Sequence, residues 1–366
     1  MITLTPTLIR VAAWLAGRPR IAGVAKQIAP TLRCLEGSPR LADVAEKSWV
    51  LVPAEPAVIP PAIFDEDDLA RVTGVDSDSS REIEWRRIRG GALEYRPSVA
   101  YQLRDAVLSK GHVILPNLVR RVTTEASPWW GRYTSTETEP SLLTATLNSS
   151  RYFGHWMMDE LTRILAAPRL GQPVAPPRAL SPHQRDYLRV LDLVYQERSE
   201  IRFRQLVIVD DRTQNSYRRE RYAILRERAR RGRRIVPCEG VMLLRKQTGV
   251  ARILVNEEEL AEQLVERGFR TICPTEHTVE EVLNACMGAK IVVGVEGSQL
   301  IHALLVMQDR GTLVTLQPPN RFNNILKTYC DGLALRYAFT VGHQRENGFY
   351  VDPAKVLRLL DRLTGS

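Results

Sequence analysis

The C-terminal third of the chain has the most regular pattern of apolar and amphipathic segments. Short apolar runs that suit buried strands occur at residues 241–244, 270–273, 290–294 and 311–316. Asn256 and the glutamates after it resemble a capping arrangement for a helix that ends at Gly268. Residues 278–281 have the pattern of a capping box, and apolar residues then recur with helical spacing. Strands that alternate with helices predict a parallel, doubly wound sheet, whose ligands bind beyond the C-terminal strand ends.

The first two thirds of the chain have a less regular pattern. Residues 49–63 are expected to be extended because their Pro-Pro pair disfavours helix, and residues 64–80 are acidic. Short strands separated by turns follow to about residue 147, for example at 112–115. Expected beyond them are helices at 155–170 and 182–196, a proline-rich connector at 171–182, a strand at 205–209 and an arginine-rich segment at 217–234.

Length and composition narrow the class of protein. A chain of 366 residues is too long for one small core, so two domains are the default expectation. The net charge of +9 favours anionic partners such as nucleotides, phosphorylated lipids, membrane surfaces or nucleic acids. No apolar run reaches the ~18 residues of a membrane-spanning helix. Five scattered cysteines without a CxxC pair are typical of reduced thiols in a cytoplasmic protein.

The N-terminus has a mixed pattern of basic and apolar residues. It lacks the order of charge, long apolar run and cleavage site that marks a signal peptide. A helix lying on a membrane surface and a helix packed on the domain both remain open for this segment. The pattern of the whole chain predicts four parts, with boundaries at residues 1–48, 49–235, 236–345 and 346–366.

A glycine-bracketed turn follows the apolar run at 290–294. The turn holds Gly294, Glu296, Gly297 and Ser298, and it leads into a helix that carries His302. Free backbone N–H groups and the positive end of a helix make such a turn a candidate anion site. The third glycine of the GxGxxG pattern is absent, and so is the Walker pattern, which argues against dinucleotides and against a P-loop.

Two further groups of polar residues are candidates for chemistry. Arg245 follows a predicted strand, and Arg252 follows it closely, so both are either phosphate-binding forks or surface arginines. His155, Asp159 and Arg163 are spaced four residues apart on one helix face. A carboxylate one turn from an imidazole is suited to general-base catalysis, and the alternative is a surface ion-pair ladder.

The segment from Gly154 to Arg163 resembles the "HWLLDxLPR" motif of glycosyltransferase family 61. Three further blocks follow in the order expected for that family, at residues 243–260, 268–274 and 291–319. The resemblance covers about residues 140–340, and four modest motifs in the same order are fairly specific. The N-terminal third matches only in general character.

The resemblance implies an α/β fold of the GT-B-like type, with two Rossmann-like domains facing a cleft and a β-containing N-terminal region. Residues 49–235 would form the acceptor-side domain, and residues 236–345 would form the Rossmann-like nucleotide-sugar domain. The basic extension 1–48 would precede these two domains. A C-terminal helix in 346–366 would pack back onto the rest of the protein.

The resemblance also implies an activity. It implies inverting transfer of a hexose or pentose from a nucleotide-diphosphate donor, such as a UDP-sugar, to a glycan or lipid-linked glycan. No cofactor, metal or nucleic acid is expected. The implied setting is bacterial capsular or extracellular polysaccharide synthesis in the cytoplasm, with peripheral contact to the inner face of the membrane.

Residue roles carry over by motif position. The catalytic pair is Asp159, as general base, with His155. The donor-binding set is Arg245, Arg252, Asn256, Gly294, Glu296, Gly297, Ser298 and His302. Glu160, Arg163 and Asp211 are candidates for the acceptor cleft, with a loop-capping role as the alternative for Asp211.

The chain departs from the family pattern in the glycine turn. The usual histidine there is Glu296, so the role of that histidine does not carry over. A carboxylate would repel a diphosphate, although it would accept hydrogen bonds from a ribose or sugar hydroxyl. A degenerate transferase that has lost activity at this position is therefore one alternative.

Charged segments supply the remaining alternatives. The stretches 65–67 and 76–78 fit the loose DxD pattern of metal-dependent transferases, but we interpret them as solvated loops. Nine arginines lie in residues 218–234. We interpret this run as a solvated helix that borders the cleft or contacts anionic lipid headgroups. A non-catalytic protein that binds anions or nucleic acid is the alternative to an enzyme.

Overall fold

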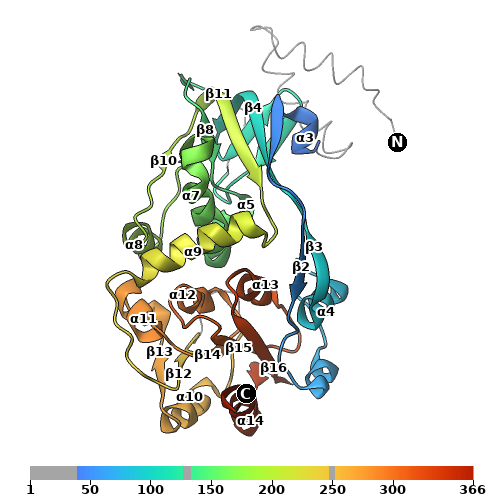
Figure 1. Ribbon diagram of the computed structural model, residues 1–366, viewed down its shortest axis with the longest axis vertical. Helices are drawn as coiled ribbons and strands as arrows, with labels where there is room; N and C mark the ends of the chain where they lie inside the picture. Colours follow the sequence, from blue (N-terminus) through green and yellow to red (C-terminus); the bar gives the residue numbers. More distant parts are fainter. Residues whose placement is uncertain (1–38, 127–132, 247–251, 366) are drawn as a thin grey trace. The chain divides into compact units, whose positions relative to one another are not determined.

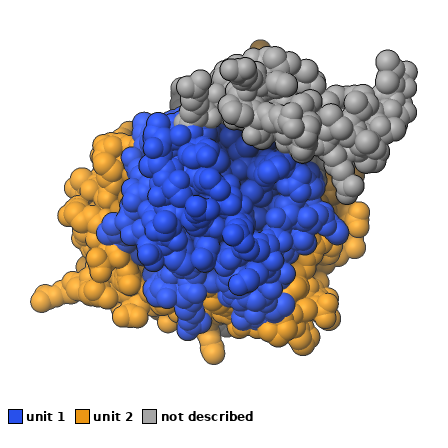
Figure 2. Space-filling model, turned by 90° about the horizontal axis from the view of Figure 1, so that it is seen from above, with its two compact units in different colours: residues 1–52, 98–179, 193–212 blue, residues 53–97, 180–192, 213–366 orange. Residues whose placement is uncertain are grey.

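The computed structural model describes residues 39–126, 133–246 and 252–365. Most of the predicted N-terminal extension, residues 1–38, lies outside the described residues. The chain divides into two compact units, coloured separately in Figure 2. Unit 1 comprises Met1–Val52, Ser98–Ala179 and Leu193–Arg212, and unit 2 comprises Pro53–Pro97, Leu180–Asp192 and Thr213–Ser366.

Unit 1 is built on a mixed sheet (Figure 1). Its strands are β1 (Lys47–Val52), β4 (Ser98–Ser109), β5 (His112–Leu115), β6 (Leu118–Arg121), β7 (Ser135–Glu137), β8 (Ser141–Leu143), β9 (Gln172–Ala175), β10 (Gln196–Glu197) and β11 (Ile201–Asp210). Its helices are α3 (Leu41–Val44), α5 (Leu147–Arg151), α6 (Phe153–His155) and α7 (Leu161–Leu170), with a π-helical turn at Trp156–Glu160 between the last two. The strand order is β10-β9-β8-β11-β4-β5-β6, with β1 also paired to β4 and β7 to β11.

One hydrophobic core cluster of unit 1 lies on one face of this sheet, and the other face also carries buried apolar residues such as Ala100 and Val207. Side chains alternate between the two faces of a strand, so Leu103 of β4 and Leu206 of β11 enter the core, whereas their neighbours Gln102 and Gln205 face the other way. The central pair, β4 and β11, is antiparallel. On one side of this pair, β11, β8, β9 and β10 are parallel to one another, so the sheet of unit 1 is mixed. The second Rossmann-like domain stays a prediction.

Unit 2 contains the remaining elements. Its strands are β2 (Glu55–Ile59), β3 (Gly91–Tyr95), β12 (Gly240–Leu243), β13 (Phe269–Ile272), β14 (Ile291–Val295), β15 (Thr312–Gln317), β16 (Arg336–Val341), β17 (His343–Arg345) and β18 (Gly348–Tyr350). Its α-helices are α4 (Arg81–Arg89), α8 (Pro182–Val190), α9 (Ser216–Arg230), α10 (Glu257–Glu266), α11 (Val279–Cys286), α12 (Ile301–Leu304), α13 (Ile325–Gly332) and α14 (Pro353–Thr364). Short 3-10 turns occur at Glu66–Arg71, Pro274–Glu276 and Ser298–Leu300.

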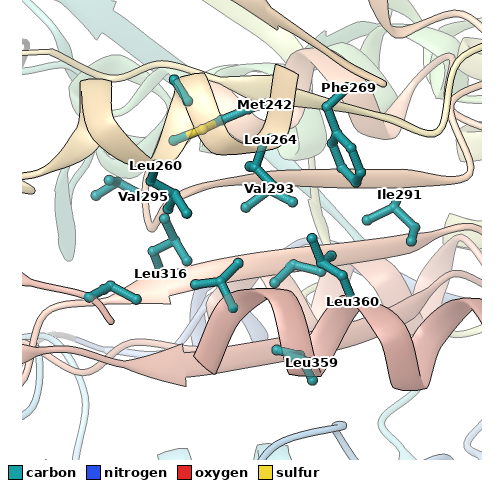
Figure 3. Close-up of a cluster of buried hydrophobic side chains, with 14 of the residues drawn as sticks. Met242, Leu260, Leu264, Phe269, Ile291, Val293, Val295, Leu316, Leu359 and Leu360 are labelled. Carbon is teal, nitrogen blue, oxygen red and sulfur yellow. The ribbon is translucent and has the colours of Figure 1, made fainter. Parts of the chain in front are cut away.

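The main sheet of unit 2 confirms the predicted parallel, doubly wound arrangement. Its order is β13-β12-β14-β15-β16, and every neighbouring pair is parallel. One face carries a cluster in which Met242 and Val293 of the strands meet Leu264 of α10 and Leu360 of α14 (Figure 3). The order of the strands reverses between β12 and β14, and ligands of such sheets bind at that reversal.

Local sequence signals account for most of these elements. The Thr278 side chain accepts from the Glu281 N–H while the Glu281 carboxylate accepts from the Thr278 N–H, so the predicted capping box is confirmed. Helix α8 ends at Val190, earlier than the predicted residue 196.

Among the described cysteines, Cys238, Cys273, Cys286 and Cys330 form no disulfide. In the ranges that the structure describes, no helix has the length and apolar character needed to cross a membrane.

The compact units divide the chain differently from the predicted domains. Residues 53–97, 180–192 and 213–235 lie in unit 2, although the sequence pattern grouped them with the N-terminal domain. The hairpin of β2 and β3 illustrates the reason, because Glu55 of β2 accepts from the backbone N–H of Ser216 at the start of α9. Such contacts join segments that lie far apart along the chain.

Candidate functional site

The C-terminal ends of β12 and β14 meet at the reversal of the unit 2 sheet. Leu243 of β12 is paired with Gly294 of β14. A side chain at Gly294 would come within 2.7 Å of the Leu243 carbonyl oxygen, so glycine permits this close approach of the strands. Arg245 follows β12, and Glu296 and Gly297 follow β14, so the predicted glycine turn lies at the position where such a sheet binds ligands.

Two arginines hold the Glu296 carboxylate at this strand end. Arg252 Nη1 lies 2.6 Å from Glu296 Oε2 and also donates to the Glu296 carbonyl oxygen at 2.7 Å. Arg321 Nη1 lies 3.4 Å from the same carboxylate oxygen and pairs through Nη2 with Asp76. Burial raises the pKa of Glu296, while the positive charges of Arg252 and Arg321 oppose that rise. The cluster thus has more cationic than anionic groups around a buried carboxylate.

Arg245 lies against the glycine turn. A side chain at Gly297 would overlap the ends of the Arg245 and Gln299 side chains, and the backbone there has a φ of +157°, which residues with a side chain rarely adopt. Arg245 Nη1 donates to Gln299 Oε1 at 2.7 Å. Burial, and next the charge of Arg252, lower the pKa of Arg245 to about 10, which still leaves the guanidinium charged at neutral pH. Arg245, Arg252 and Arg321 form what we call the arginine cluster.

The backbone after β12 is anchored by the first residue of α10. The Glu257 carboxylate accepts from the N–H groups of Arg245 and Lys246, each at 2.8 Å. Asn256 precedes the helix, as predicted, but its side chain does not cap it. It instead donates to the Val351 carbonyl oxygen at 2.9 Å and accepts from the Val351 N–H at 3.2 Å. Asn256 therefore ties α10 to the C-terminal segment.

Two expectations for the glycine turn need correction. Ser298 begins a 3-10 turn that leads into α12, which has only four residues, so a long helix dipole is not available there. The positive charge comes instead from the arginine cluster. Glu296 was expected to repel a diphosphate, but its carboxylate is neutralised by Arg252 and Arg321.

His302 lies in a different environment from the arginine cluster. Its Nδ1 is 2.6 Å from the Tyr187 hydroxyl, and its ring packs edge-on against His183 at 5.5 Å. Burial lowers the pKa of His302 to about 3, so the imidazole is neutral. These contacts place His302 in the packing of α12 against α8, and its contact with the donor stays a prediction.

The predicted catalytic pair is formed in unit 1. His155 ends α6, and Asp159 lies in the π-helical turn, where the Leu161 N–H bonds to the Trp156 carbonyl. His155 Nδ1 lies 2.6 Å from Asp159 Oδ2. Their side chains are 27% and 16% exposed, so the pair is half-buried yet reachable from solvent. π-Helical turns are frequent at functional sites.

Arg163 does not continue the predicted polar stripe. It is buried, and its guanidinium donates to the Thr144 carbonyl oxygen at 3.3 Å and to Asp211 at 3.4 Å. Glu160 is also buried and receives two hydrogen bonds from Arg178, one at 3.0 Å. A surface ion-pair ladder is thus excluded. Glu160, Arg163 and Asp211 hold the helix in place in unit 1.

Several expectations about charged segments are wrong. Asp76 is buried against Arg321, so the interpretation of 76–78 as a solvated loop is wrong for that residue. In 65–67, Asp65 and Asp67 pair with Lys355, but Asp67 is 71% exposed, as expected for a solvated segment. In α9, Arg218, Arg221 and Arg226 are buried. Arg226 donates to the Met307 carbonyl oxygen at 2.7 Å and to Asp309 at 2.8 Å. The arginine-rich helix therefore serves the packing of unit 2.

Sequence reasoning missed Asp76, Arg178 and Arg321 as site or supporting residues. Arg321 alone gave a usable signal, since it is a cation just beyond the strand at 312–317. As for metal ligands, the ranges covered by the structure contain no group of three His, Cys, Asp or Glu side chains that could hold a metal ion.

The family model described as Glycosyltransferase 61 matches residues 153–314. This range includes the His155–Asp159 pair, Arg245, Arg252 and Glu296, whereas Asp76 and Arg321 lie outside it. No curated protein matches the chain.

Proposed function

We propose that this chain, whose residues 153–314 match the family model of glycosyltransferase 61, is a member of that family and transfers a sugar from a nucleotide-diphosphate donor to a hydroxyl of a glycan acceptor with inversion. Family membership supports sugar transfer in general, with a sugar donor and a glycan acceptor. The nucleotide, the inverting course and the residue roles are our proposal.

The arginine cluster is the observation that carries the proposal. Arg245, Arg252 and Arg321 converge on the strand ends where a doubly wound sheet binds its ligand. Guanidinium groups bind phosphate oxygens through paired hydrogen bonds. Glu296 keeps Arg252 and Arg321 in place, and it is available to a ribose or sugar hydroxyl. Unit 2 is therefore suited to a nucleoside diphosphate.

The His155–Asp159 pair supplies the proton acceptor. In the proposed displacement, the acceptor hydroxyl oxygen forms a bond to the anomeric carbon of the donor sugar while the bond from that carbon to the diphosphate oxygen breaks. The hydroxyl proton passes to Asp159, with His155 orienting the carboxylate or sharing the proton. The nucleoside diphosphate leaves with the electron pair, and Arg245 with the backbone N–H groups of Gly297 and Ser298 stabilises its charge.

The proposed setting follows from charge and family. The net charge of +9 suits an acceptor linked to an anionic lipid carrier and peripheral contact with the inner face of a membrane. We propose a role in bacterial capsular or extracellular polysaccharide synthesis in the cytoplasm. The donor sugar is proposed to be a hexose or pentose, and the transfer to proceed without a metal ion or cofactor.

Donor binding is the direct test. UDP-, GDP- and CMP-sugars are compared by thermal shift with the full chain, and we expect one diphosphate class to raise the melting temperature by at least about 2 °C at saturation. The Arg245→Met variant should bind that donor about 10- to 100-fold more weakly, because a charge-assisted hydrogen bond to phosphate is lost. Arg231→Met is the matched control, since Arg231 is exposed directly after the end of α9.

Two results would contradict the proposal. One is the absence of a shift with every nucleotide-sugar, and the other is an equal loss of donor binding in the Arg245 and Arg231 variants. Salt-dependent binding to random oligonucleotides without donor binding would support the non-catalytic alternative.

A further inference from the structure

Unit 1 has a surface hollow on the face of its sheet opposite the hydrophobic cluster that contains Leu103 and Leu206. The hollow has a volume of about 580 Å³. Trp49, Gln102 and Gln205 line it from three adjacent strands, and the end of α7, residues 168–170, forms one wall. It contains none of the residues of the proposed donor or catalytic chemistry.

Strand register explains why these three side chains gather. Trp49 of β1 is paired with Ala100 of β4, two residues from Gln102 and on the same face. Gln205 of β11 is paired with Arg104, which is two residues from Gln102 in the other direction. Diagonal neighbours of this kind lie close enough for long side chains to share a ligand. Trp49, Gln102 and Gln205 thus form a diagonal row, which we call the tryptophan–glutamine row.

The row offers both an apolar plane and hydrogen-bonding groups. Trp49 is 37% exposed, an unusual amount for a large aromatic residue on a sheet. Gln102 donates to Glu46 at 3.1 Å, whereas the amide of Gln205 has no hydrogen-bond partner among the residues that the structure describes. A side-chain amide presents two donors and an acceptor. Gln172, which also lines the hollow, adds a third such group.

This chemistry matches an uncharged sugar better than other ligands. Sugar rings combine apolar C–H faces, which pack on aromatic planes, with hydroxyls that donate and accept hydrogen bonds. Glu139 and Arg169 also line the hollow and have opposite charges, so the lining has no net preference for an anion. A lipid chain would instead need an apolar lining.

We propose that the tryptophan–glutamine row binds a neutral segment of the acceptor glycan. That the ligand is an acceptor glycan rests on the function proposed above. Helix α7 begins directly after Glu160, next to Asp159 in the chain, and its last residues line the hollow. Ten helical residues span about 15 Å. The row therefore contacts sugar units remote from the hydroxyl that reacts, and the site selects oligosaccharides over monosaccharides.

The test is binding of the full chain, without donor, to an array of neutral and acidic oligosaccharides of one to six sugar units. We expect binding to neutral oligosaccharides and none to monosaccharides. Trp49→Ala should raise the apparent Kd about five- to tenfold, since an aromatic stacking contact is lost. Gln205→Ala should have a smaller effect, and Trp49→Phe should retain part of the affinity.

Val50→Ala is the matched control, because Val50 is the next residue of β1, is exposed, and points to the opposite face. Its affinity should equal that of the unaltered chain, and melting temperatures check that all variants fold. Binding to acidic glycans alone, no binding to any neutral oligosaccharide, or equal affinity in Trp49→Ala and Val50→Ala would overturn the proposal. Failure of transfer with every donor would overturn the proposed function instead and leave the array result standing.

Discussion

Two histidines of this chain make hydrogen bonds of the same length in opposite surroundings. His155 lies 2.6 Å from a carboxylate in unit 1, and His302 lies 2.6 Å from a tyrosine hydroxyl in unit 2. The first pair is partly exposed, and the second is buried, with its imidazole pKa lowered to about 3. Both were candidates for chemistry from motif position. From the difference in burial and partner, we infer that His155 takes part in the reaction and that His302 packs a helix.

The largest expected effect comes from removing the carboxylate of the exposed pair. Asp159→Asn should lower the rate of transfer by about 10²- to 10⁴-fold while donor affinity stays unchanged, because general-base catalysis is lost without loss of shape. Turnover with the assigned donor and acceptor is the measurement. Asp186→Asn, in a surface pair with Arg189 on α8, is the control. Unchanged turnover in Asp159→Asn would remove this residue as the base.

A smaller loss is expected for the imidazole of the same pair. His155→Asn should lower the rate by about 10²-fold, near the lower end of the range for general acid–base catalysis. Groups that act as one unit have non-additive effects. The double variant should therefore be no slower than Asp159→Asn alone, as measured by turnover. If the rate loss of the double variant equals the product of the two single losses, the two residues act separately.

The buried pair should make stability depend on pH. The pKa of His302 is depressed in the folded state, so between about pH 6.5 and pH 3 the unfolded chain binds a proton that the folded chain does not. The stabilisation that comes from keeping His302 neutral is therefore complete above pH 6.5, and it is lost as the pH falls. We expect a loss of about 2–3 kcal/mol in unfolding free energy at pH 4.5. Urea unfolding at pH 4.5 and 7 measures this loss. The unfolding free energy of His302→Asn should depend less steeply on pH. An equal pH dependence in the unaltered chain and in His302→Asn would show that His302 is not its origin.

The smallest effect is expected from the hydroxyl that His302 contacts. Tyr187→Phe should lower the unfolding free energy by about 1–2 kcal/mol, since it removes one buried hydrogen bond. Transfer by the folded variant should keep its normal rate, in contrast to the Asp159 variant. Thermal melting and turnover on the same sample decide this. A lower rate of transfer at unchanged stability would mean that His302 and Tyr187 take part in the reaction.

The sequence predicted those features that depend on neighbours within a few residues. The Thr278 cap, the strands of the parallel sheet and the His155–Asp159 spacing are examples, because each is set within one helical turn or one strand. Asn256 shows the limit. Its position before α10 was predicted correctly, but its partner is Val351, which is far away along the chain and leaves no local pattern.

The same limit applies to the charged residues. Asp76 and Arg321 pair across a long stretch of chain, and nothing near either residue indicates the other. The arginines of α9 were expected in solvent because charged side chains usually lie there, yet three are buried. The fold of unit 1 was also out of reach, since the partners of short strands in a mixed sheet are set by contacts between distant segments.

The π-helical turn at Trp156–Glu160 has a consequence for how related sequences diverge. Such a turn contains one residue more than an ordinary helical turn, so losing a single residue there would restore a regular helix. It would also rotate His155 by about 100° around the helix axis relative to α7, because each helical residue turns the chain by that amount. Insertions and deletions within this stretch should therefore be far rarer among functional relatives than substitutions, and a relative that carries one should also have lost its histidine or its aspartate.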